Sequence, residues 1–177
     1  ALYEGEALPP LSIQYKDFAL WQRAYLNDEV LERQLNYWHD TLKYHTPLNL
    51  PTDYTRPSSF DYQGADYAFE LPEALSSRLQ ALAQSLGVTL YTVLLTGFYL
   101  LLSRYTGQTD ILIGTFTSNR HYPGVEGLLG FFVNTLALRF QFDSTLCGKD
   151  SIKALYTCLV EAQTHQDLPF ERLLSSL

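Results

Sequence analysis

The chain has 177 residues, of which 46% are hydrophobic and 18% are charged. It has enough apolar side chains for a packed core and too little charge for an intrinsically disordered protein. Its 12 Lys and Arg residues stand against 19 Asp and Glu, which gives a net charge of −7. This balance argues against a nucleic-acid partner, because affinity for a phosphate backbone rests on clustered cations.

Cysteine usage and hydropathy narrow the class of protein further. Cys147 and Cys158 are too few and too far from any histidine pair to build a metal cage or a disulfide framework, so we expect reduced thiols in a cytoplasmic protein and no metal. The most apolar run, residues 88–102, is shorter than the ~20 residues that cross a bilayer. We therefore expect no membrane segment, and nothing at the start of the sequence indicates export.

The first third of the chain predicts an arm, two helices and a loop. Residues 1–12 lack a helical period and are expected to be a connecting arm. Residues 13–26 predict a helix, because aromatic side chains recur at spacings of three and four. Residues 28–42 predict a second helix with Asn27 as its N-cap. Residues 47–62 are rich in proline and are expected to form a surface loop.

The middle of the chain predicts a strand followed by two helices. Residues 65–71 are a plausible strand. Pro72 then marks the beginning of an amphipathic helix that Gly87 ends. Residues 89–104 are apolar on nearly every face, which predicts a central core helix that other elements cover on most sides.

Two strands and a helical end complete the expected order of elements. Residues 110–116 and 131–142 are rich in β-forming side chains and predict core strands. Residues 150–166 return to helical periodicity, and Pro169 begins a last short turn. The resulting order favours mixed α/β layers over a doubly wound repeat.

Sequence signatures of common catalytic and nucleotide-binding sites are absent. The sequence contains no GxSxG and no HExxH, and Gly124, Gly127 and Gly130 fit neither GxGxxG nor GxxxxGK[ST]. Cys158 lies among apolar helical residues, where a buried inert thiol is expected.

The four histidines give no catalytic pattern either. His39 and His45 lie among polar residues and are expected to be solvated, whereas His121 falls in a loop. His165 lies at a helix end, where the helix dipole favours a structural cap. General-base work by His121 or His165 is the alternative interpretation.

Asn134 is the unusual residue of the second predicted strand. It is the only amide on a face that also carries Phe132, Leu136, Leu138, Phe140 and Phe142. A buried amide without partners costs about 1–3 kcal/mol, so something must be hydrogen-bonded to it. The backbone of a neighbouring loop and a substrate group in a tunnel are the two open alternatives.

Three segments together resemble the condensation domains of nonribosomal peptide synthetases. Residues 13–22 (IQYKDFALWQ) resemble the QYxDYAxWQ motif, residues 130–139 (GFFVNTLALR) resemble GxFVNTLxLR, and residues 165–173 (HQDLPFERL) resemble HQDxPFExL. Their order and spacing agree with the family, and residues 50–53 and 105–111 are similar to further stretches of it. The resemblance covers nearly the whole chain.

The resemblance implies a chloramphenicol-acetyltransferase-like fold of the α/β class, with two lobes that enclose a tunnel. In that family an acceptor amine attacks a donor thioester, and both substrates are held on the phosphopantetheine arms of carrier (thiolation) domains. The implied partners are the upstream and downstream carrier domains, the N-terminal lobe of the same condensation domain and a neighbouring adenylation domain. No cofactor is expected to bind the chain directly.

The HHxxxDG motif of the family, which holds its central histidine, does not occur in these 177 residues. We therefore assign no catalytic residue. Residues 13–177 are expected to be the C-terminal lobe of a condensation domain, incomplete at its C-terminal end and inactive alone.

The resemblance also implies roles for individual residues. Asn134 is expected to line the substrate tunnel together with Gly130, Phe132 and Thr135. Motif residues expected to serve lobe packing are Asp17, Trp21, Arg120, Asp167 and Phe170.

Two alternative functions remain open on the sequence. An epimerization domain of the same fold is one, although the intact GFFVNTLALR and HQDLPFE strings fit a condensation domain better. A module that only docks or scaffolds carrier proteins is the other.

Overall fold

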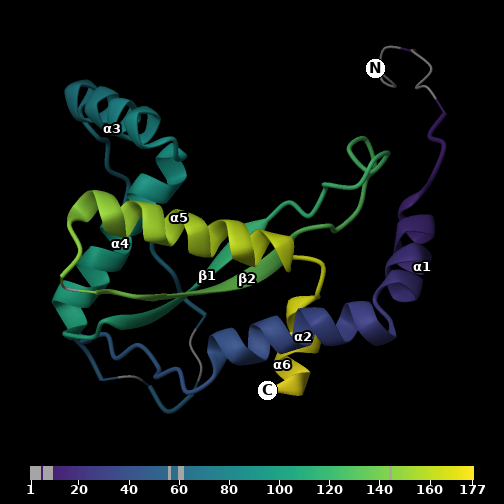
Figure 1. Ribbon diagram of the computed structural model, residues 1–177, viewed down its shortest axis with the longest axis horizontal. Helices are drawn as coiled ribbons and strands as arrows, with labels where there is room; N and C mark the ends of the chain where they lie inside the picture. The colour runs from purple at the N-terminus through teal and green to yellow at the C-terminus, as the bar shows by residue number, and fades with distance from the viewer. Residues whose placement is uncertain (1–4, 6–9, 56, 60–61, 144) are drawn as a thin grey trace. The chain divides into compact units, whose positions relative to one another are not determined.

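The computed structural model describes residues 5, 10–55, 57–59, 62–143 and 145–177, so most of the expected connecting arm, residues 1–12, lies outside the described part. Eight elements follow one another along the chain (Figure 1). They are α1 (Tyr15–Tyr25), α2 (Asp28–Leu42), α3 (Glu73–Leu86), α4 (Leu90–Thr106), β1 (Asp110–Thr117), β2 (Asn134–Gln141), α5 (Gly148–Thr164) and α6 (Phe170–Ser176).

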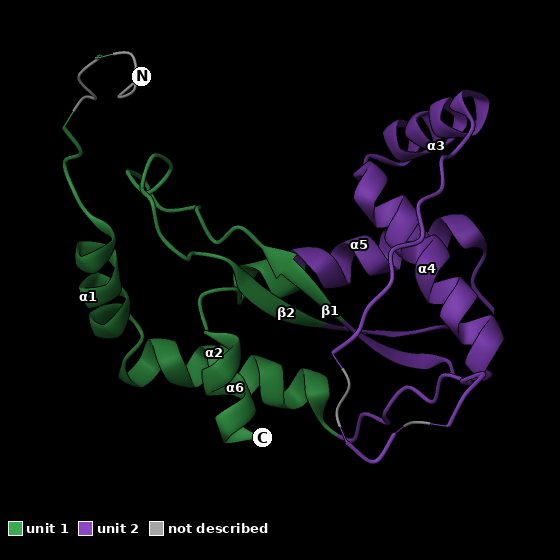
Figure 2. Ribbon diagram, turned by 180° about the vertical axis from the view of Figure 1, so that it is seen from behind, with its two compact units in different colours: residues 1–43, 114–137, 161–177 green, residues 44–113, 138–160 purple. Residues whose placement is uncertain are grey.

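Contacts divide the chain into two compact units (Figure 2). Unit 1 consists of residues 1–43, 114–137 and 161–177, and unit 2 consists of residues 44–113 and 138–160. Both strands and α5 run from one unit into the other. The sequence predicted a single lobe over residues 13–177 and did not anticipate this division.

The helices α1 and α2 of unit 1 begin close to the positions that the sequence predicts. At α1 the side chain of Asp17 accepts the backbone N–H of Gln14 at 2.8 Å, one half of a capping box. Asn27 occupies the N-cap position of α2, but its side chain makes no cap hydrogen bond, contrary to expectation. Asp28, the first residue of α2, has φ 35°, a positive value that is unusual for a residue other than glycine. The two acidic residues of the first turn, Asp28 and Glu29, still complement the helix dipole.

Cap residues bound the helices of unit 2, and one of them, Gly87, was predicted from the sequence. Thr89 caps α4, because its hydroxyl accepts the backbone N–H of Thr92 at 3.2 Å. Gly87 ends α3 with φ 66°, a left-handed conformation that glycine adopts without strain. The two helices pack through a small core around Ala83 and Val93.

Only one side of α4 is buried, whereas the sequence predicted cover on most sides. Thr92 and Tyr99 are 0% exposed, and the Tyr99 hydroxyl donates to the Leu138 carbonyl at 2.6 Å. Burial raises the pKa of Tyr99 above its usual range. Apolar side chains on other faces of α4 are between 44% and 68% exposed, namely Tyr91, Leu94, Phe98, Leu101 and Tyr105. The apolar composition of residues 89–104 therefore predicted the helix correctly, but α4 is less buried than that composition indicated.

The two strands form an antiparallel pair, because the Phe142 amide after β2 donates to the Thr109 carbonyl before β1 at 2.8 Å. Residues 65–71 were predicted as a strand, and the structure contradicts this: the sheet of the described chain has two strands and does not include them. Tyr67 and Phe69 are 89% and 74% exposed, so no layer of the described chain covers the apolar side of this segment. A strand needs a neighbouring strand for its backbone hydrogen bonds and a packed layer for its apolar side.

The C-terminal helices follow the predicted order. In unit 1, α6 packs on α2, and the indole N–H of Trp38 donates to the His165 carbonyl at 2.9 Å.

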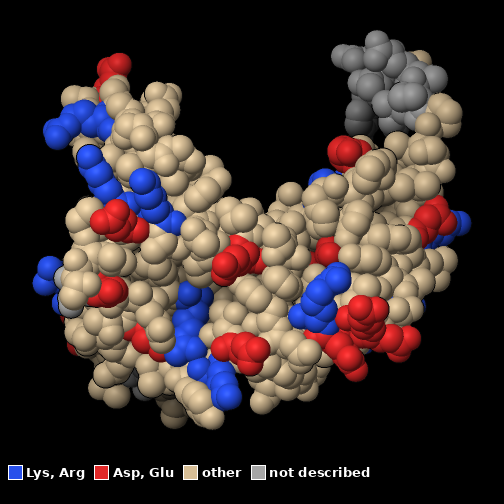
Figure 3. Space-filling model, viewed as in Figure 1, with Lys and Arg blue, Asp and Glu red and all other residues tan. Residues whose placement is uncertain are grey.

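Among the described residues no single helix is long and apolar enough to cross a membrane, although α3 and α4 would reach that length together across a bend of 107°. On the face drawn in Figure 3, basic and acidic side chains are interspersed.

Candidate functional site

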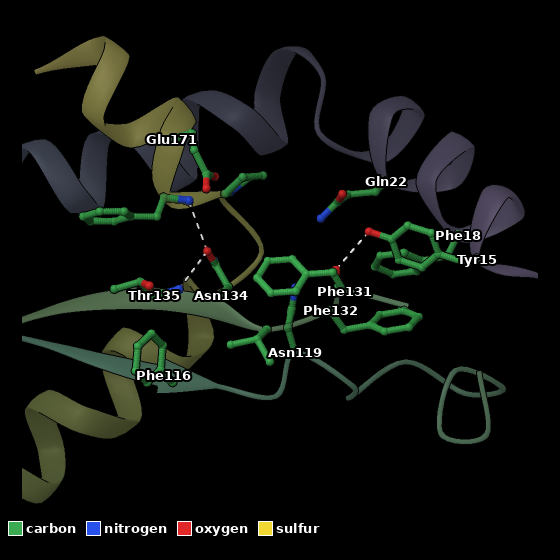
Figure 4. Close-up of a pocket in the computed structure, with 13 residues that line it drawn as sticks. Tyr15, Phe18, Gln22, Phe116, Asn119, Phe131, Phe132, Asn134, Thr135 and Glu171 are labelled. Carbon is green, nitrogen blue, oxygen red and sulfur yellow. Dashed lines mark hydrogen bonds between the residues drawn. The ribbon is translucent and has the colours of Figure 1, made fainter. Parts of the chain in front are cut away.

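A pocket of about 250 Å³ lies in unit 1, where β1 ends and β2 begins (Figure 4). Its walls come from residues 15–22 of α1, residues 116–119, residues 131–135 and residues 169–171. Three of the four predicted tunnel residues line it, namely Phe132, Asn134 and Thr135. The fourth, Gly130, is not among the lining residues but directly precedes that stretch.

The Asn134 side chain uses all of its hydrogen-bonding capacity within unit 1. Its Nδ2 donates to the carbonyls of Gln166 and Leu168, both at 2.8 Å. Its Oδ1 accepts the backbone N–H groups of Thr135 at 2.9 Å and of Phe170 at 3.1 Å. Of the two partners that the sequence left open, the loop backbone is therefore the one found in the structure.

Two further contacts hold the same loop, residues 166–170, against unit 1. The Thr117 hydroxyl donates to Gln166 Oε1 at 2.6 Å. The Tyr122 hydroxyl donates to Asp167 Oδ1 at 2.9 Å, and His121 Nε2 lies 3.1 Å from the same oxygen. Burial, together with hydrogen bonds to Tyr25 and Asp167, raises the pKa of Tyr122 above its usual range. The loop is thus fixed at several points along its length.

Gly130 allows α1 to approach the segment that leads into β2. A Cβ atom at this position would lie 2.2 Å from Cδ2 and 2.7 Å from Cγ of Tyr15. The Tyr15 hydroxyl donates to the Phe131 carbonyl at 2.9 Å, and its ring meets Phe132 edge-on at 5.1 Å. Glycine is therefore needed here for space.

Arg120 organises the loop between the strands. Its Nη1 donates to the carbonyls of Val125 at 2.6 Å and Leu128 at 3.0 Å, and its guanidinium lies 4.1 Å from the centre of the Phe132 ring. Val125, Leu128 and Phe132 belong to one buried cluster of unit 1. The cation therefore ties the loop to the pocket wall.

The other motif residues expected to serve packing also lie in unit 1. Trp21 stacks on Tyr25 at 4.9 Å and meets Tyr122 edge-on at 4.3 Å. Asp17 forms the capping contact of α1, and the Phe170 amide forms one of the contacts to Asn134.

Asn119 is a residue of the pocket wall that the sequence analysis missed. It is 5% exposed, and its Oδ1 has no hydrogen-bond partner among the described residues. Its φ of 52° is left-handed, a conformation that Asn tolerates better than most residues. Position in a loop after a strand was the only sequence signal, and it does not reveal an unpaired acceptor.

The histidines and cysteines do not converge on the pocket. His39 Nε2 is 2.9 Å from Ser176 Oγ, and His165, which directly follows α5, has its Nδ1 3.0 Å from the Glu161 carbonyl in the last turn of that helix, as expected of a structural cap. Neither cysteine forms a disulfide; Cys147 is exposed and Cys158 is half-buried. No group of three metal-ligating side chains occurs in the part of the chain that the structure describes.

Comparison with known proteins identifies the family. The condensation domain family model matches residues 1–177. The chain belongs to the condensation domain family. This confirms the resemblance carried by the three motifs.

Curated relatives of this condensation domain sequence are peptide synthetases. It is 44% identical over 177 residues to tyrocidine synthase 3 of Brevibacillus parabrevis, covering 99% of this chain and 3% of that protein. It is 38% identical over 177 residues to bacitracin synthase 3 of Bacillus licheniformis, again covering 99% of this chain and 3% of that protein. The chain therefore spans a small fraction of the relatives it matches.

Solved structures agree with the family assignment. A four-domain nonribosomal peptide synthetase bound to AMP and glycine matches 96% of this chain and 13% of its own, at 27% identity and a TM-score of 0.86. The condensation domain of the monacolin K polyketide synthase MokA matches 99% of this chain and 42% of its own, at 25% identity and a TM-score of 0.79. The predicted mixed α/β fold is thus confirmed as that of condensation domains.

Proposed function

We propose that this chain is part of a condensation domain that joins two carrier-bound aminoacyl or peptidyl thioesters through an amide bond. The match of the condensation domain family to residues 1–177 carries the proposal. The acceptor amine attacks the donor thioester carbonyl, the new C–N bond forms, and the C–S bond to the donor arm breaks. The amine proton leaves with a base outside these residues, which contain no HHxxxDG.

The contribution of this chain to the reaction is positional. Asn134, Phe132 and Thr135 line a pocket beside the HQDLPFERL segment, and Gly130 allows α1 to close one side of it. We propose that this wall faces the substrate tunnel. The Asn134 amide is occupied by backbone groups, so it acts by fixing the wall, and a group that is already saturated has little capacity left for a substrate.

The proposed partners follow from the same family. They are the upstream and downstream carrier domains with their phosphopantetheine arms, the N-terminal lobe that bears HHxxxDG, and a neighbouring adenylation domain. The multidomain synthetases among the relatives support this assignment, and we place the protein in the cytoplasm.

The test is amide formation by a complete condensation domain that includes this sequence. Donor and acceptor carriers are loaded with aminoacyl groups, and the acceptor carrier is analysed by intact-protein mass spectrometry. We expect a dipeptidyl carrier with the complete domain and none with the 177-residue chain alone. A dipeptidyl product from the chain alone would contradict the proposed role of the missing motif.

The same assay separates the two alternatives. An epimerization domain would invert the Cα centre of a carrier-bound residue without forming a dipeptide, which chiral analysis of the released amino acid detects. A scaffold module would bind loaded carriers in the absence of the other lobe. Either result, without dipeptide formation by the complete domain, would replace the proposed function.

A further inference from the structure

The pocket of unit 1 takes its walls from segments that lie far apart in the sequence, so its shape depends on what joins them. Residues 15–22 of α1 form one wall, and residues 169–171 form another (Figure 4). Each wall continues into a part of the chain that does not line the pocket. The helix α1 runs on to Tyr25, and Asp167 precedes the second wall. A contact between these two continuations fixes the separation of the walls.

Tyr122 makes this contact from the loop between β1 and β2. Its hydroxyl donates to Asp167 Oδ1 at 2.9 Å. Its ring meets Trp21 edge-on at 4.3 Å and Tyr25 edge-on at 6.1 Å, and a hydrogen bond also joins it to Tyr25. Tyr122 is not among the described residues that line the pocket, so it acts on the pocket through the walls that it joins.

The hydrogen bond from Tyr122 to Asp167 is of the stronger kind. Its acceptor is a carboxylate whose side chain is 13% exposed, and a hydrogen bond to a charged group contributes more than one between neutral groups. Burial, together with the hydrogen bonds to Tyr25 and Asp167, raises the pKa of Tyr122 above its usual range. The hydroxyl therefore keeps the proton that it donates.

His121 lies 3.1 Å from the same carboxylate oxygen but does not join the walls. Its side chain is 38% exposed, so solvent and salt screen its interaction with Asp167. Among the described residues its ring contacts Tyr122, at 4.1 Å between ring centres, and no ring of α1. The link from Asp167 to α1 therefore runs through Tyr122.

We propose that Tyr122 and Asp167 are positioning residues for amide formation, because their hydrogen bond holds the α1 wall and the 169–171 wall at a fixed separation. This inference rests on the proposed function, in which the pocket wall faces the substrate tunnel. Neither residue lines the pocket, so both act through the residues that do. A displacement of reacting groups by about 1 Å can lower the rate of a chemical step about 100-fold.

Three substitutions separate this role from simple packing. Tyr122→Phe keeps the ring beside Trp21 and Tyr25 and removes the hydroxyl. Asp167→Leu removes the acceptor, whereas Asp167→Asn keeps an oxygen that accepts the hydroxyl and serves as the rescuing variant. His121→Gln is the matched control, because His121 is the neighbour of Tyr122 and approaches the same oxygen of Asp167.

The experiment measures dipeptide formation by the complete condensation domain over a range of acceptor-carrier concentrations, with each rate corrected for the folded fraction by circular dichroism. We expect Tyr122→Phe and Asp167→Leu each to lower kcat about tenfold and to change the KM for the acceptor carrier less than about twofold. Asp167→Asn should stay within about threefold of the wild-type kcat, and His121→Gln within about twofold. Tyr122→Phe combined with Asp167→Leu should be no slower than Asp167→Leu alone.

Several results would overturn the proposal. A wild-type kcat in Tyr122→Phe is one, and an equal loss in His121→Gln is another. Losses that multiply in the double variant would show that the two residues do not act through one hydrogen bond. A raised KM with unchanged kcat would show that they affect binding and not positioning. If Tyr122→Phe does not fold, the comparison of Asp167→Asn with Asp167→Leu decides.

The wild-type domain in the same assay separates this inference from the proposed function. Dipeptide formation by the wild type, with unchanged kcat in the variants, would reject the positioning role and leave the proposed function intact. No dipeptide from the wild-type domain would reject the proposed function, and the positioning role with it.

Discussion

Asn134 Oδ1 accepts the backbone N–H of Phe170 at 3.1 Å, which joins the first residue of β2 to the first residue of α6. The two residues are 36 positions apart in the sequence. The other side of the same amide donates to the carbonyls of Gln166 and Leu168. One side chain thus fixes both ends of the loop that closes the pocket wall, and it links the GFFVNTLALR and HQDLPFERL motifs physically.

This arrangement predicts that Asn134→Leu destabilises the condensation domain. The substitution keeps the volume but leaves backbone groups of the 166–170 loop without partners, so the free energy of unfolding should fall by at least about 1–3 kcal/mol. Urea denaturation measures the loss, and dipeptide formation by the folded variant measures the effect on turnover.

Thr135→Val is the matched control for that substitution. Thr135 also lines the pocket, but its hydroxyl forms no hydrogen bond among the described residues, so unfolding should change little. If Asn134→Leu keeps wild-type stability and loses turnover, the amide contacts substrate and the structural role assigned to it is wrong.

Gly130→Ala is predicted to displace Tyr15 from its place on the pocket wall. The new Cβ would lie 2.2–2.8 Å from three ring atoms, and the ring cannot retreat without losing the hydrogen bond to the Phe131 carbonyl. The expected loss of stability is about 1–3 kcal/mol, typical of overpacking. Thermal unfolding measures it.

Gly127→Ala provides the comparison for Gly130→Ala. A Cβ at Gly127 meets no atom within 4 Å, and its φ is not in the left-handed range. We expect stability to stay within about 0.5 kcal/mol of the wild type or to rise slightly. Equal losses at both positions would show that the loop responds to any loss of glycine, and not to the contact with Tyr15.

The features of the fold that depend on local periodicity were predicted from the sequence. Apolar spacing located the helices, and alternation along residues 131–142 identified Asn134 as a polar residue on an apolar face, because the strand period is two. Residues 65–71 also alternate, yet they form no strand in the structure. Alternation describes the side chains of a segment, whereas a strand also requires a neighbour that the sequence does not reveal.

The candidate pocket was predictable only in part, because a local stretch of sequence does not reveal which residues are neighbours in space. Its walls combine α1, the strand ends and the segment before α6, and no single window of sequence contains them. The motif resemblance brought Phe132, Asn134 and Thr135 together. It did not find Asn119, whose unpaired oxygen depends on what surrounds it in space.

The two thiols are predicted to react at different rates. Cys147 is exposed, whereas Cys158 is half-buried with its Sγ 3.3 Å from the Arg139 carbonyl. Ellman's reagent should therefore modify one thiol rapidly and the second only slowly, because access limits the second reaction. Cys147→Ser should remove the rapid phase. Two thiols should be counted after denaturation without reductant, and a count of zero would contradict the absence of a disulfide.

The final prediction concerns the ion pair between Asp110 of β1 and Arg139 of β2 in unit 2. Two of its contacts are 2.8 Å and 2.5 Å long, and both side chains are largely shielded from solvent. The hydrogen bonds from Arg139 lower the pKa of Asp110 below its ordinary value of 3.8, with burial opposing the shift. A carboxyl group whose pKa is lowered by folding stabilises the folded state above its unfolded pKa and loses that contribution as the pH falls through its folded pKa. The wild-type protein should therefore lose part of its stability below about pH 3.8.

Asp110→Asn tests this pH dependence directly. It removes the charge, so it should lower the free energy of unfolding at pH 7 by up to about 1.5–3 kcal/mol, the range for a hydrogen bond to a charged group. The difference between variant and wild type should shrink as the pH falls through the folded pKa of Asp110, because the wild-type carboxyl then becomes neutral as well. Urea midpoints measured from pH 7 to pH 2.5 give that difference. Asp143→Asn is the control, since Asp143 is exposed and its carboxylate, within the described part of the chain, hydrogen-bonds to the nearby Thr145, so its substitution should change the midpoint at pH 7 much less. A difference for Asp110→Asn that stays constant down to pH 2.5 would show that the pair contributes through shape and not through charge.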